Sequence, residues 1–252
     1  MVRPDLKLWW KPREPSQAED YEKLASFVNC LPGFDPIYQS WLRSPKTKQQ
    51  VLPVPLNEAE AKKIITENMA KYDFGGGPWP EMGSRFGAGH AGPPPYDFRK
   101  SSYADTSRTI GAYGKPLGLL RNHIFMRLSA ARPSTGLPWR ASRLRPMMKF
   151  AREVWNPREM LAMFSFCMND LPEIPDPTWA AGKRTLKPWI GWITYLPPDL
   201  ASRAKYSAET HVETLEGGEA LVTLCEEPFE KTDAEGKARL RALEAALRPI
   251  QS

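Results

Sequence analysis

The residues with the clearest potential for chemistry are a glycine-rich hexapeptide, the histidines, and a cysteine next to carboxylates. Gly87-Ala88-Gly89-His90-Ala91-Gly92 has the glycine spacing of a dinucleotide-binding fingerprint. Such a fingerprint needs a strand before it and a helix after it, because the pyrophosphate lies at the N-terminus of that helix. Here Pro93-Pro94-Pro95 follows directly, so we expect a loop that binds no cofactor.

Neither a metal site nor an activated nucleophile is indicated by the other groups. The chain has three histidines, which are His90, His123 and His211. None has a cysteine or carboxylate three or four residues further on, as a metal-binding pair on a helix would require. Cys225 precedes Glu226 and Glu227, and a neighbouring carboxylate raises the pKa of a thiol, which makes it a weaker nucleophile. We expect no catalytic residue, no metal and no enzymatic activity.

Charge is distributed unevenly along the chain, although the net charge is only +6. No acidic residue occurs between Asp105 and Glu153, where the chain has these basic residues: Arg108, Lys115, Arg121, Arg127, Arg132, Arg140, Arg143, Arg145, Lys149 and Arg152. From 209 to 235 the balance is reversed, and Lys231 alone offsets the acidic side chains. Such an asymmetry is often a solvated surface without a role, but it can also provide patches that steer charged partners.

Length and composition indicate a folded protein of the cytoplasm. With 252 residues, 41% hydrophobic residues and nine tryptophans, the chain can bury a sizeable core. No segment approaches the ~20 apolar residues that span a bilayer, and the first residues lack the apolar core of a signal peptide. Cys30, Cys167 and Cys225 are widely spaced and odd in number, which suits a reducing compartment better than a disulfide framework.

Hydrophobic periodicity predicts the elements that position these groups. Strands are expected where apolar residues alternate or run together, at 6–10, 109–113, 120–128, 189–196 and 220–225. The last two should be buried neighbours in one sheet. One helix is expected to begin after Ser16, and a second to run from 58 to 71 after the capping residue Asn57. A third should have Pro146 in its first turn, and the last should begin near the Thr232 and Glu235 capping pair.

Glycine and proline mark two long connections. Residues 73–100 and 129–146 are rich in both, and we expect loops there. The pattern of strands and single helices predicts an α+β fold, with a mainly antiparallel sheet and helices packed on it. The chain is expected to form one domain, 1–252, and the two loops leave open a division into subdomains 1–128 and 146–252.

Two segments of the C-terminal half carry a recognisable pattern. They are Trp-Ile-Gly-Trp-Ile-Thr-Tyr-Leu at 189–196, and Gly-Gly-Glu-Ala-Leu-Val-Thr-Leu-Cys-Glu-Glu-Pro-Phe at 217–229, followed by a helix. The strand at 6–10, a helix, and Phe34-Asp35-Pro36 leading to Trp41 are consistent with the same pattern. Together these motifs resemble the immunity protein 52 family of bacterial polymorphic toxin systems, type VI secretion among them. The resemblance covers most of the chain except 72–100 and 129–146.

The resemblance implies a cytoplasmic immunity protein that binds one secreted toxin, encoded by the adjacent gene, and blocks it by stoichiometric protein–protein contact. In the family that toxin is typically a nuclease with a restriction-endonuclease-like fold. No cofactor and no nucleic-acid, membrane or small-molecule partner is implied. The residues that match the family's strand and turn are expected to be structural, and they are Trp189, Gly191, Trp192, Tyr195, Pro228 and Phe229. Gly191 should allow a close approach of another backbone.

An acidic surface is the simplest way for such a protein to meet a nuclease. A nuclease is electropositive where it grips phosphate, so acidic side chains on an inhibitor can occupy that site. The toxin-binding candidates are Glu209, Glu213, Glu216, Glu219, Glu226 and Glu227. The overall positive charge departs from this picture and leaves open inhibition elsewhere, such as at a toxin dimer interface or an apolar exosite.

An alternative hypothesis is a nucleic-acid-binding protein that uses the basic span 108–152, with Tyr113, Phe125 and Trp139 interleaved. No known recognition motif is present there. Binding to mixed-sequence DNA at physiological salt separates the two hypotheses, because a true binder shows a steep dependence on salt. An enzyme is a third hypothesis, without an identifiable site.

Overall fold

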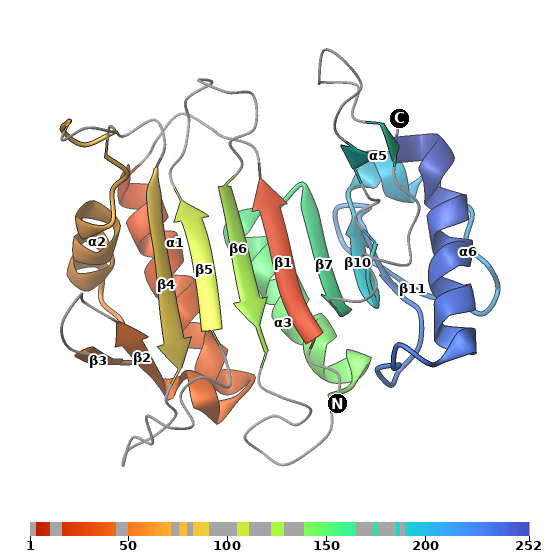
Figure 1. The fold of residues 1–252 in the computed structure, drawn as a ribbon, viewed down its shortest axis with the longest axis horizontal. Coiled ribbons are helices and arrows are strands. Elements are labelled where there is room, and N and C mark those ends of the chain that lie inside the picture. Colours follow the sequence, from red (N-terminus) through yellow and green to blue (C-terminus); the bar gives the residue numbers. More distant parts are fainter. Residues whose placement is uncertain are drawn as a thin grey trace.

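The computed structural model describes residues 4–10, 17–43, 50–71, 76–79, 83–90, 105–110, 122–128, 139–164, 174–175, 185–186 and 190–251 of the chain. In this part of the chain, one ten-stranded sheet has the order β11-β12-β10-β7-β1-β6-β5-β4-β2-β3, and all its pairings are antiparallel. Helices pack on this sheet. The predicted α+β fold with a mainly antiparallel sheet is confirmed (Figure 1).

The N-terminal strand lies in the middle of the sheet. β1 (Pro4–Trp10) pairs with β6 (Asn122–Arg127) on one side and with β7 (Glu159–Phe164) on the other. Leu6 and Leu8 are buried on the same face, as a period of two requires. The strand predicted at 6–10 is confirmed, and its place joins early and late parts of the chain in one sheet. The proposed division into subdomains stays a prediction.

The other strands extend the sheet in both directions. Toward one edge lie β5 (Asp105–Ile110), β4 (Ser84–His90), β2 (Ser40–Arg43) and β3 (Gln50–Pro53). Toward the other edge lie β10 (Ile193–Leu196), β12 (Ala220–Thr223) and β11 (His211–Thr214). A separate pair consists of β8 (Ile174–Pro175) and β9 (Thr185–Leu186). As predicted, the buried strands β10 and β12 are direct neighbours.

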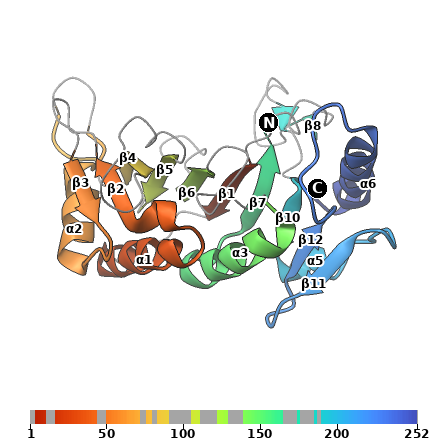
Figure 2. The ribbon, with the colours of Figure 1, turned by 90° about the horizontal axis from the view of Figure 1, so that it is seen from below.

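Helices cover the sheet on both sides. One face carries α1 (Gln17–Cys30), α2 (Glu58–Glu67) and α3 (Ala141–Trp155), whereas α6 (Ala234–Gln251) lies on the opposite side near β10 and β12 (Figure 2). The short helices are η1 (Leu31–Gly33), η2 (Pro36–Gln39) and α5 (Pro198–Ala201). Among the described helices, none is both long enough and apolar enough to cross a bilayer.

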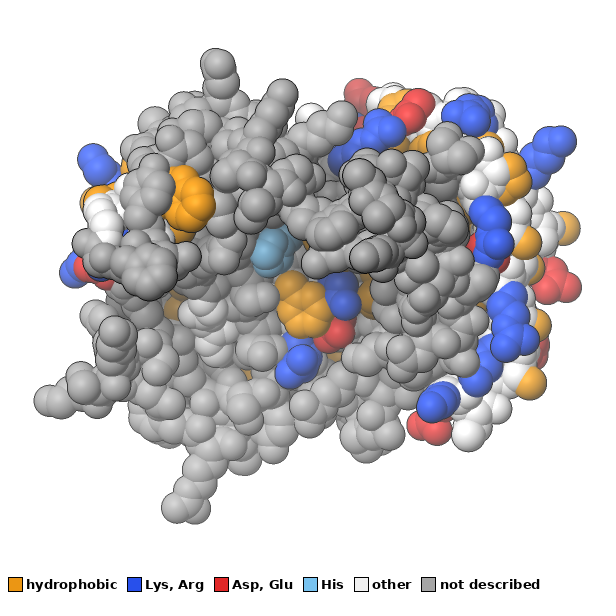
Figure 3. Space-filling model, turned by 45° about the horizontal axis from the view of Figure 1, so that its top comes forward, with side chains coloured by type: hydrophobic (Ala, Val, Ile, Leu, Met, Phe, Trp, Pro, Cys, Tyr) orange, Lys and Arg blue, Asp and Glu red, His pale blue; other side chains and the backbone are white. Residues whose placement is uncertain are grey.

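Charged side chains of both signs are mixed at one end of the molecule, on the face that Figure 3 shows. Figure 3 shows Lys and Arg interspersed with Asp and Glu at the end of the molecule that α6 forms. At that end, the positive and negative charges are therefore not separated into two large patches.

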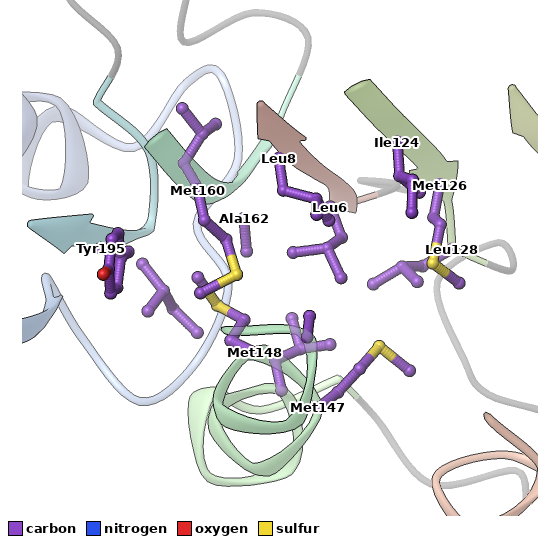
Figure 4. Close-up of a cluster of buried hydrophobic side chains, with 14 of the residues drawn as sticks. Leu6, Leu8, Ile124, Met126, Leu128, Met147, Met148, Met160, Ala162 and Tyr195 are labelled. Atoms are coloured by element: carbon purple, nitrogen blue, oxygen red, sulfur yellow. The ribbon is translucent and has the colours of Figure 1, made fainter. Parts of the chain in front are cut away.

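The main core lies between the sheet and α3. Leu6, Leu8 and Met160 point from the sheet toward Met147 and Met148 of α3, and all of them are buried (Figure 4). Full burial of one such side chain stabilises the fold by about 1.5–3 kcal/mol. A slip of one residue would turn these side chains to the other face, so their burial fixes the register of the strands.

An aromatic cluster continues this core toward α1. Trp10 of β1 stacks on Trp155 of α3, with ring centroids 4.9 Å apart. Phe27 of α1 meets Trp155 edge to face at 5.9 Å. Offset and edge-to-face pairs add about 0.5–1.5 kcal/mol beyond the area that they bury. These rings therefore tie α1 and α3 to the central strand.

Strand β4 corrects the expected loop at 73–100. Ser84–His90 forms a strand that includes Gly87 and Gly89 of the fingerprint-like hexapeptide, whereas Gly92 lies outside the described residues. Gly87 lies opposite Ser107 of β5 and Gly89 lies opposite Asp105, while β2 pairs with the other edge. Hydrogen bonds on both edges outweigh the low strand propensity of glycine. Local composition could not predict this, because the paired strands lie elsewhere in the chain.

Helix α3 begins earlier than predicted. It starts at Ala141, so Pro146 lies inside the helix instead of in its first turn. The expected loop at 129–146 is therefore wrong for 141–146, while 139 and 140 lie in neither a helix nor a strand, and 129–138 lie outside the described residues. The acceptors that allow the early start come from residue 226, far along the chain.

Of the other predicted helix caps, the one at α2 is confirmed and the one at α6 is wrong. At α2 the side chain of Asn57 accepts from the N–H of Glu60 at 2.8 Å, and the Glu60 carboxylate accepts from the N–H of Asn57 at 3.4 Å, which confirms the capping box. At α6 the Asp233 carboxylate accepts from the N–H of Gly236 at 3.0 Å, so the predicted Thr232 and Glu235 pair is wrong. The cap predicted at Ser16 lies outside the described residues.

Strand ends differ from the predictions by a few residues. The strand expected at 109–113 begins earlier, at 105, and is described to 110, while 111–113 lie outside the described residues. The strand expected at 120–128 is described at 122–127, and 120 and 121 lie outside the described residues. Among the described residues, the strand expected at 189–196 covers 193–196, and the one expected at 220–225 ends at 223. The ends of a strand depend on its hydrogen-bonded partner, which a local apolar pattern does not include.

Candidate functional site

The β11–β12 hairpin and the turn after β12 hold most of the acidic candidates. The N–H of Leu215 donates to the carbonyl of Glu219 at 2.8 Å, and the N–H of Gly218 donates to the carbonyl of Leu215 at 3.0 Å. Gly218 has a φ of +81°, a left-handed conformation that glycine adopts without strain. A tight turn thereby joins the two strands of the hairpin, with Glu213 before the turn and Glu219 at its end.

A basic face of α3 lies opposite this hairpin. Lys149 forms an ion pair with Glu213. Arg145 lies 3.9 Å from Glu213 and 4.0 Å from Glu226. Positions 145, 149 and 152 are four and three residues apart, so they share one face of the helix. The basic and acidic clusters that the sequence presents as two separate surfaces thus meet within the molecule.

The most buried of these pairs joins Arg152 and Glu219. The Nε of Arg152 donates to Oε1 of Glu219 at 2.9 Å, and the side chain of Glu219 is only 7% exposed. Burial alone would raise the pKa of Glu219, but the hydrogen bonds from Arg152 and from the backbone outweigh it and hold that pKa below its ordinary value. Burial and the nearby Glu219 carboxylate also raise the pKa of Tyr195 to about 12.

Glu226 caps helix α3 from the other end of the chain. Its carbonyl accepts from the N–H of Ala141 at 2.8 Å, and its carboxylate accepts from the N–H of Ser142 at 3.0 Å and from the Ser142 hydroxyl. The first N–H groups of a helix need such acceptors, and a negative charge there is favourable. Burial opposes the charge, yet the bonds from Ser142 and the nearby Arg145 lower the pKa of Glu226.

The structure therefore divides the six candidate glutamates by role. Glu213, Glu219 and Glu226 hold the hairpin and α3 together. Glu227 is exposed and lies 3.0 Å from Arg140, a surface pair that contributes little to stability. Glu209 and Glu216 are exposed, and neither forms an ion pair with a described residue. These two carboxylates are the acidic candidates that a partner can reach most directly.

The motif residues just before β10 and in the turn after β12 form a buried aromatic cluster. Trp192 is fully buried, stacks on Phe164 at 5.5 Å, and donates from Nε1 to the carbonyl of Cys225 at 2.7 Å. Phe229 meets Phe164 edge to face at 5.6 Å. Their burial agrees with the expected structural role. Tyr195 is buried as well and Pro228 is half-buried, while Trp189 lies outside the described residues.

Gly191 meets the expectation of a close backbone approach. A Cβ atom at this position would lie 2.3 Å from the carbonyl oxygen of Ala162 in β7. No side chain fits at that distance, because the obstacle is backbone of the neighbouring strand. The glycine thus sets how closely the entry to β10 packs on β7.

The cysteine near the hairpin, Cys225, is a poor candidate for a nucleophile. Burial raises the pKa of the half-buried Cys225 thiol, which donates to the carbonyl of Glu227 at 3.0 Å. Cys30 is exposed, and Cys167 lies outside the described residues. Within the described ranges, no group of three or more His, Cys, Asp or Glu side chains is arranged to hold a metal ion.

Sequence reasoning did not identify α3 as the partner of the acidic hairpin. The signal was present in part, since Arg145, Lys149 and Arg152 recur at helical spacing. The missing information was the strand order, which places β12 and β11 beyond β10 and within reach of α3. Ser142 carried no signal, because its role depends on where α3 begins.

Comparisons with known proteins show similarity at the level of structure. No protein-family model and no curated protein sequence matches the chain. Among solved structures, the Pseudomonas aeruginosa T6SS protein PA0821 has a similar fold, with a TM-score of 0.56 and 10% sequence identity. The match covers 99% of this chain and 73% of that chain. At this identity the similarity is one of fold.

Proposed function

We propose that this chain is an immunity protein of a type VI secretion context, which binds a cognate secreted toxin and neutralises it by stoichiometric contact. The shared fold with the T6SS protein PA0821 over 99% of this chain is the observation that carries the proposal. The sequence motifs at 189–196 and 217–229 support it independently, because they resemble those of an immunity protein family. The strands in these motifs, β10 and β12, are hydrogen-bonded neighbours.

The proposed mechanism is occupation of a toxin surface, and it needs no reaction. The toxin expected from the resemblance is a nuclease with a restriction-endonuclease-like fold, which must be electropositive where it grips phosphate. Glu209, Glu216 and Glu227 are the exposed carboxylates of the hairpin region that can approach such a surface. Charges at the rim of an interface act mainly by accelerating association and excluding wrong partners.

The geometry gives less support to the alternative of nucleic-acid binding through 108–152. Arg140, Arg145, Lys149 and Arg152 from that span lie in ion pairs with glutamates of the same molecule. A cation that is already paired releases fewer counterions on contact with phosphate. Binding to mixed-sequence DNA at physiological salt remains the simple discriminator between the two functions.

Co-expression with the product of the adjacent gene tests the proposal directly. We expect the two proteins to co-purify as a stable complex, and we expect this chain to protect cells without lowering the amount of toxin. The measurement is growth after toxin induction, together with the mass of the purified complex. The immunity function is wrong if no complex forms, or if protection persists in variants that no longer bind.

Reversing the accessible carboxylates tests the acidic contribution to capture. For Glu209→Lys combined with Glu216→Lys, we expect association with the toxin to slow about tenfold at 0.1 M salt. The effect should largely disappear at 1 M, because the Debye length falls from about 10 Å to about 3 Å. Association rates from surface-based binding kinetics measure this. Glu213 and Glu219 are left intact because they pair with α3.

A matched control separates the effect of charge near the hairpin from the effect of the protein's net charge. Glu22→Lys combined with Glu153→Lys changes the net charge equally, and both side chains are exposed on the helical layer. This control should associate at nearly the wild-type rate. Equal rates for the wild-type protein and the Glu209 and Glu216 reversal at low salt, with the fold intact, would assign capture to another surface.

A further inference from the structure

Strand β11 forms one open edge of the ten-stranded sheet. It is the last strand in the sheet order, and β12 is its partner on the inner side. An edge strand presents a row of backbone N–H and C=O groups that can pair with another chain. The chemistry of this edge therefore depends on which residues direct their backbone groups outward.

The register identifies those residues. The N–H of Leu215 donates to Glu219 across the hairpin, so Leu215 directs its backbone groups toward β12. Because this direction alternates with each residue of an antiparallel strand, the backbone groups of Glu213 also face β12. Those of Val212 and Thr214 face outward. In the described part of the chain, no hydrogen bond satisfies these outward groups.

Proline, exposed lysine and a bulge are not found in β11. Natural edges are often blocked by proline, by an exposed lysine or by a bulge, and β11 is the tetrapeptide His-Val-Glu-Thr, paired in continuous register. The opposite edge, β3, ends in Pro53. The shortness of β11, four residues, limits random pairing but leaves room for a specific partner.

The hairpin that carries this edge is held in place before any partner arrives. Glu213 pairs with Lys149, and Glu219 pairs with Arg152, so the hairpin is joined to α3 on both sides of its turn. A preorganised edge loses little conformational entropy on binding. The ion pair also draws the Glu213 carboxylate onto the helical side of the sheet and away from an incoming strand.

We infer that the toxin docks by adding an extended segment to the β11 edge, with its backbone paired to Val212 and Thr214. This inference rests on the proposed function and specifies its interface. The exposed carboxylates of Glu209 and Glu216 lie just beyond the two ends of β11. Their charge fits a segment that carries basic side chains on both sides of its paired residues. Main-chain pairing supplies affinity and the flanking charges supply selectivity.

Replacing Thr214 by proline tests the edge. Thr214→Pro removes an N–H that faces outward, so the ladder with β12 keeps its hydrogen bonds and the fold should survive. We expect binding to the purified product of the adjacent gene to weaken roughly ten- to a hundredfold, through one lost hydrogen bond and one stranded acceptor. Thr214→Val retains the N–H and should bind within about twofold of wild type. Thermal unfolding of both variants checks the fold.

Backbone hydrogen exchange gives a second measurement that needs no variant. In the complex with the same toxin, the amides of Val212 and Thr214 should become protected, beyond the change at other exposed amides. If wild-type protein forms no complex, the proposed function fails. If wild type and Thr214→Pro bind equally, or if these amides stay unprotected in the complex, the edge inference alone is overturned. It is also overturned if light scattering shows self-association of the free protein that Thr214→Pro abolishes, since a second copy would then occupy the edge.

Discussion

Replacing Trp192 by alanine is expected to lower the free energy of unfolding by about 3–5 kcal/mol. The indole is fully buried and stacks on Phe164, so its removal leaves a cavity between β10 and the turn after β12. Its Nε1 also donates a hydrogen bond to the carbonyl of Cys225, and this carbonyl would lose its donor. The midpoint of urea denaturation, with an unchanged slope, measures the loss.

Trp192→Phe is the matched control for this prediction. It keeps an aromatic ring against Phe164 but removes the hydrogen bond to Cys225. We expect it to cost about 1–3 kcal/mol, the range for a buried acceptor without a donor. A denaturation midpoint for Trp192→Ala equal to that of wild type would place this strand outside the cooperative core.

The second large effect concerns the pair of Arg152 and Glu219. Arg152→Met should destabilise the protein by about 2–4 kcal/mol at pH 7, because it leaves a buried carboxylate without its cation. The value lies below that of a fully buried pair because Arg152 is 28% exposed. Adding Glu219→Met should recover most of the loss, since two apolar side chains then replace the pair. Chemical denaturation of both variants measures the difference.

The pH dependence of Arg152→Met gives this prediction a second readout. In wild type the pKa of Glu219 is lowered, so the pair stabilises above the unfolded pKa of about 4.3, and this stabilisation is lost as pH falls through the folded pKa. Without Arg152, burial should dominate and raise the Glu219 pKa, so protonation of Glu219 removes the unpaired buried charge in the variant. The loss of unfolding free energy relative to wild type should therefore shrink from pH 7 toward pH 4. A deficit that is constant over this interval contradicts the role assigned to the pair.

Local patterns in the sequence predicted elements whose causes are local. The alternation at 124–128 identified the buried face of β6, because a period of two depends only on the strand itself. Asn57 and Glu60 identified the start of α2, because a capping box spans four residues. The stripe of Leu240, Leu243 and Leu247 identified the buried face of α6.

Features that depend on distant parts of the chain were predicted poorly. Gly87 and Gly89 indicated a loop, yet ladders with β5 and β2 make that segment a strand. Arg152 was assigned to the basic span and Glu219 to the toxin-binding candidates, although they bind each other. No local pattern states which charges will meet, because that depends on strand order and helix placement. The open edge at β11 is likewise a property of the whole sheet.

The cap that Glu226 provides for α3 also sets an order of events during synthesis. The acceptor for Ser142 lies 84 residues further along the chain, so α3 leaves the ribosome long before its cap exists. Likewise, β1 cannot complete its pairing until β6 and β7, which follow it in the chain, have been translated. Contacts of such long sequence separation close slowly compared with local helix formation. The native packing of α3 is therefore reached only after residue 226 has been translated, so a shorter nascent chain cannot yet present the finished hairpin to a partner.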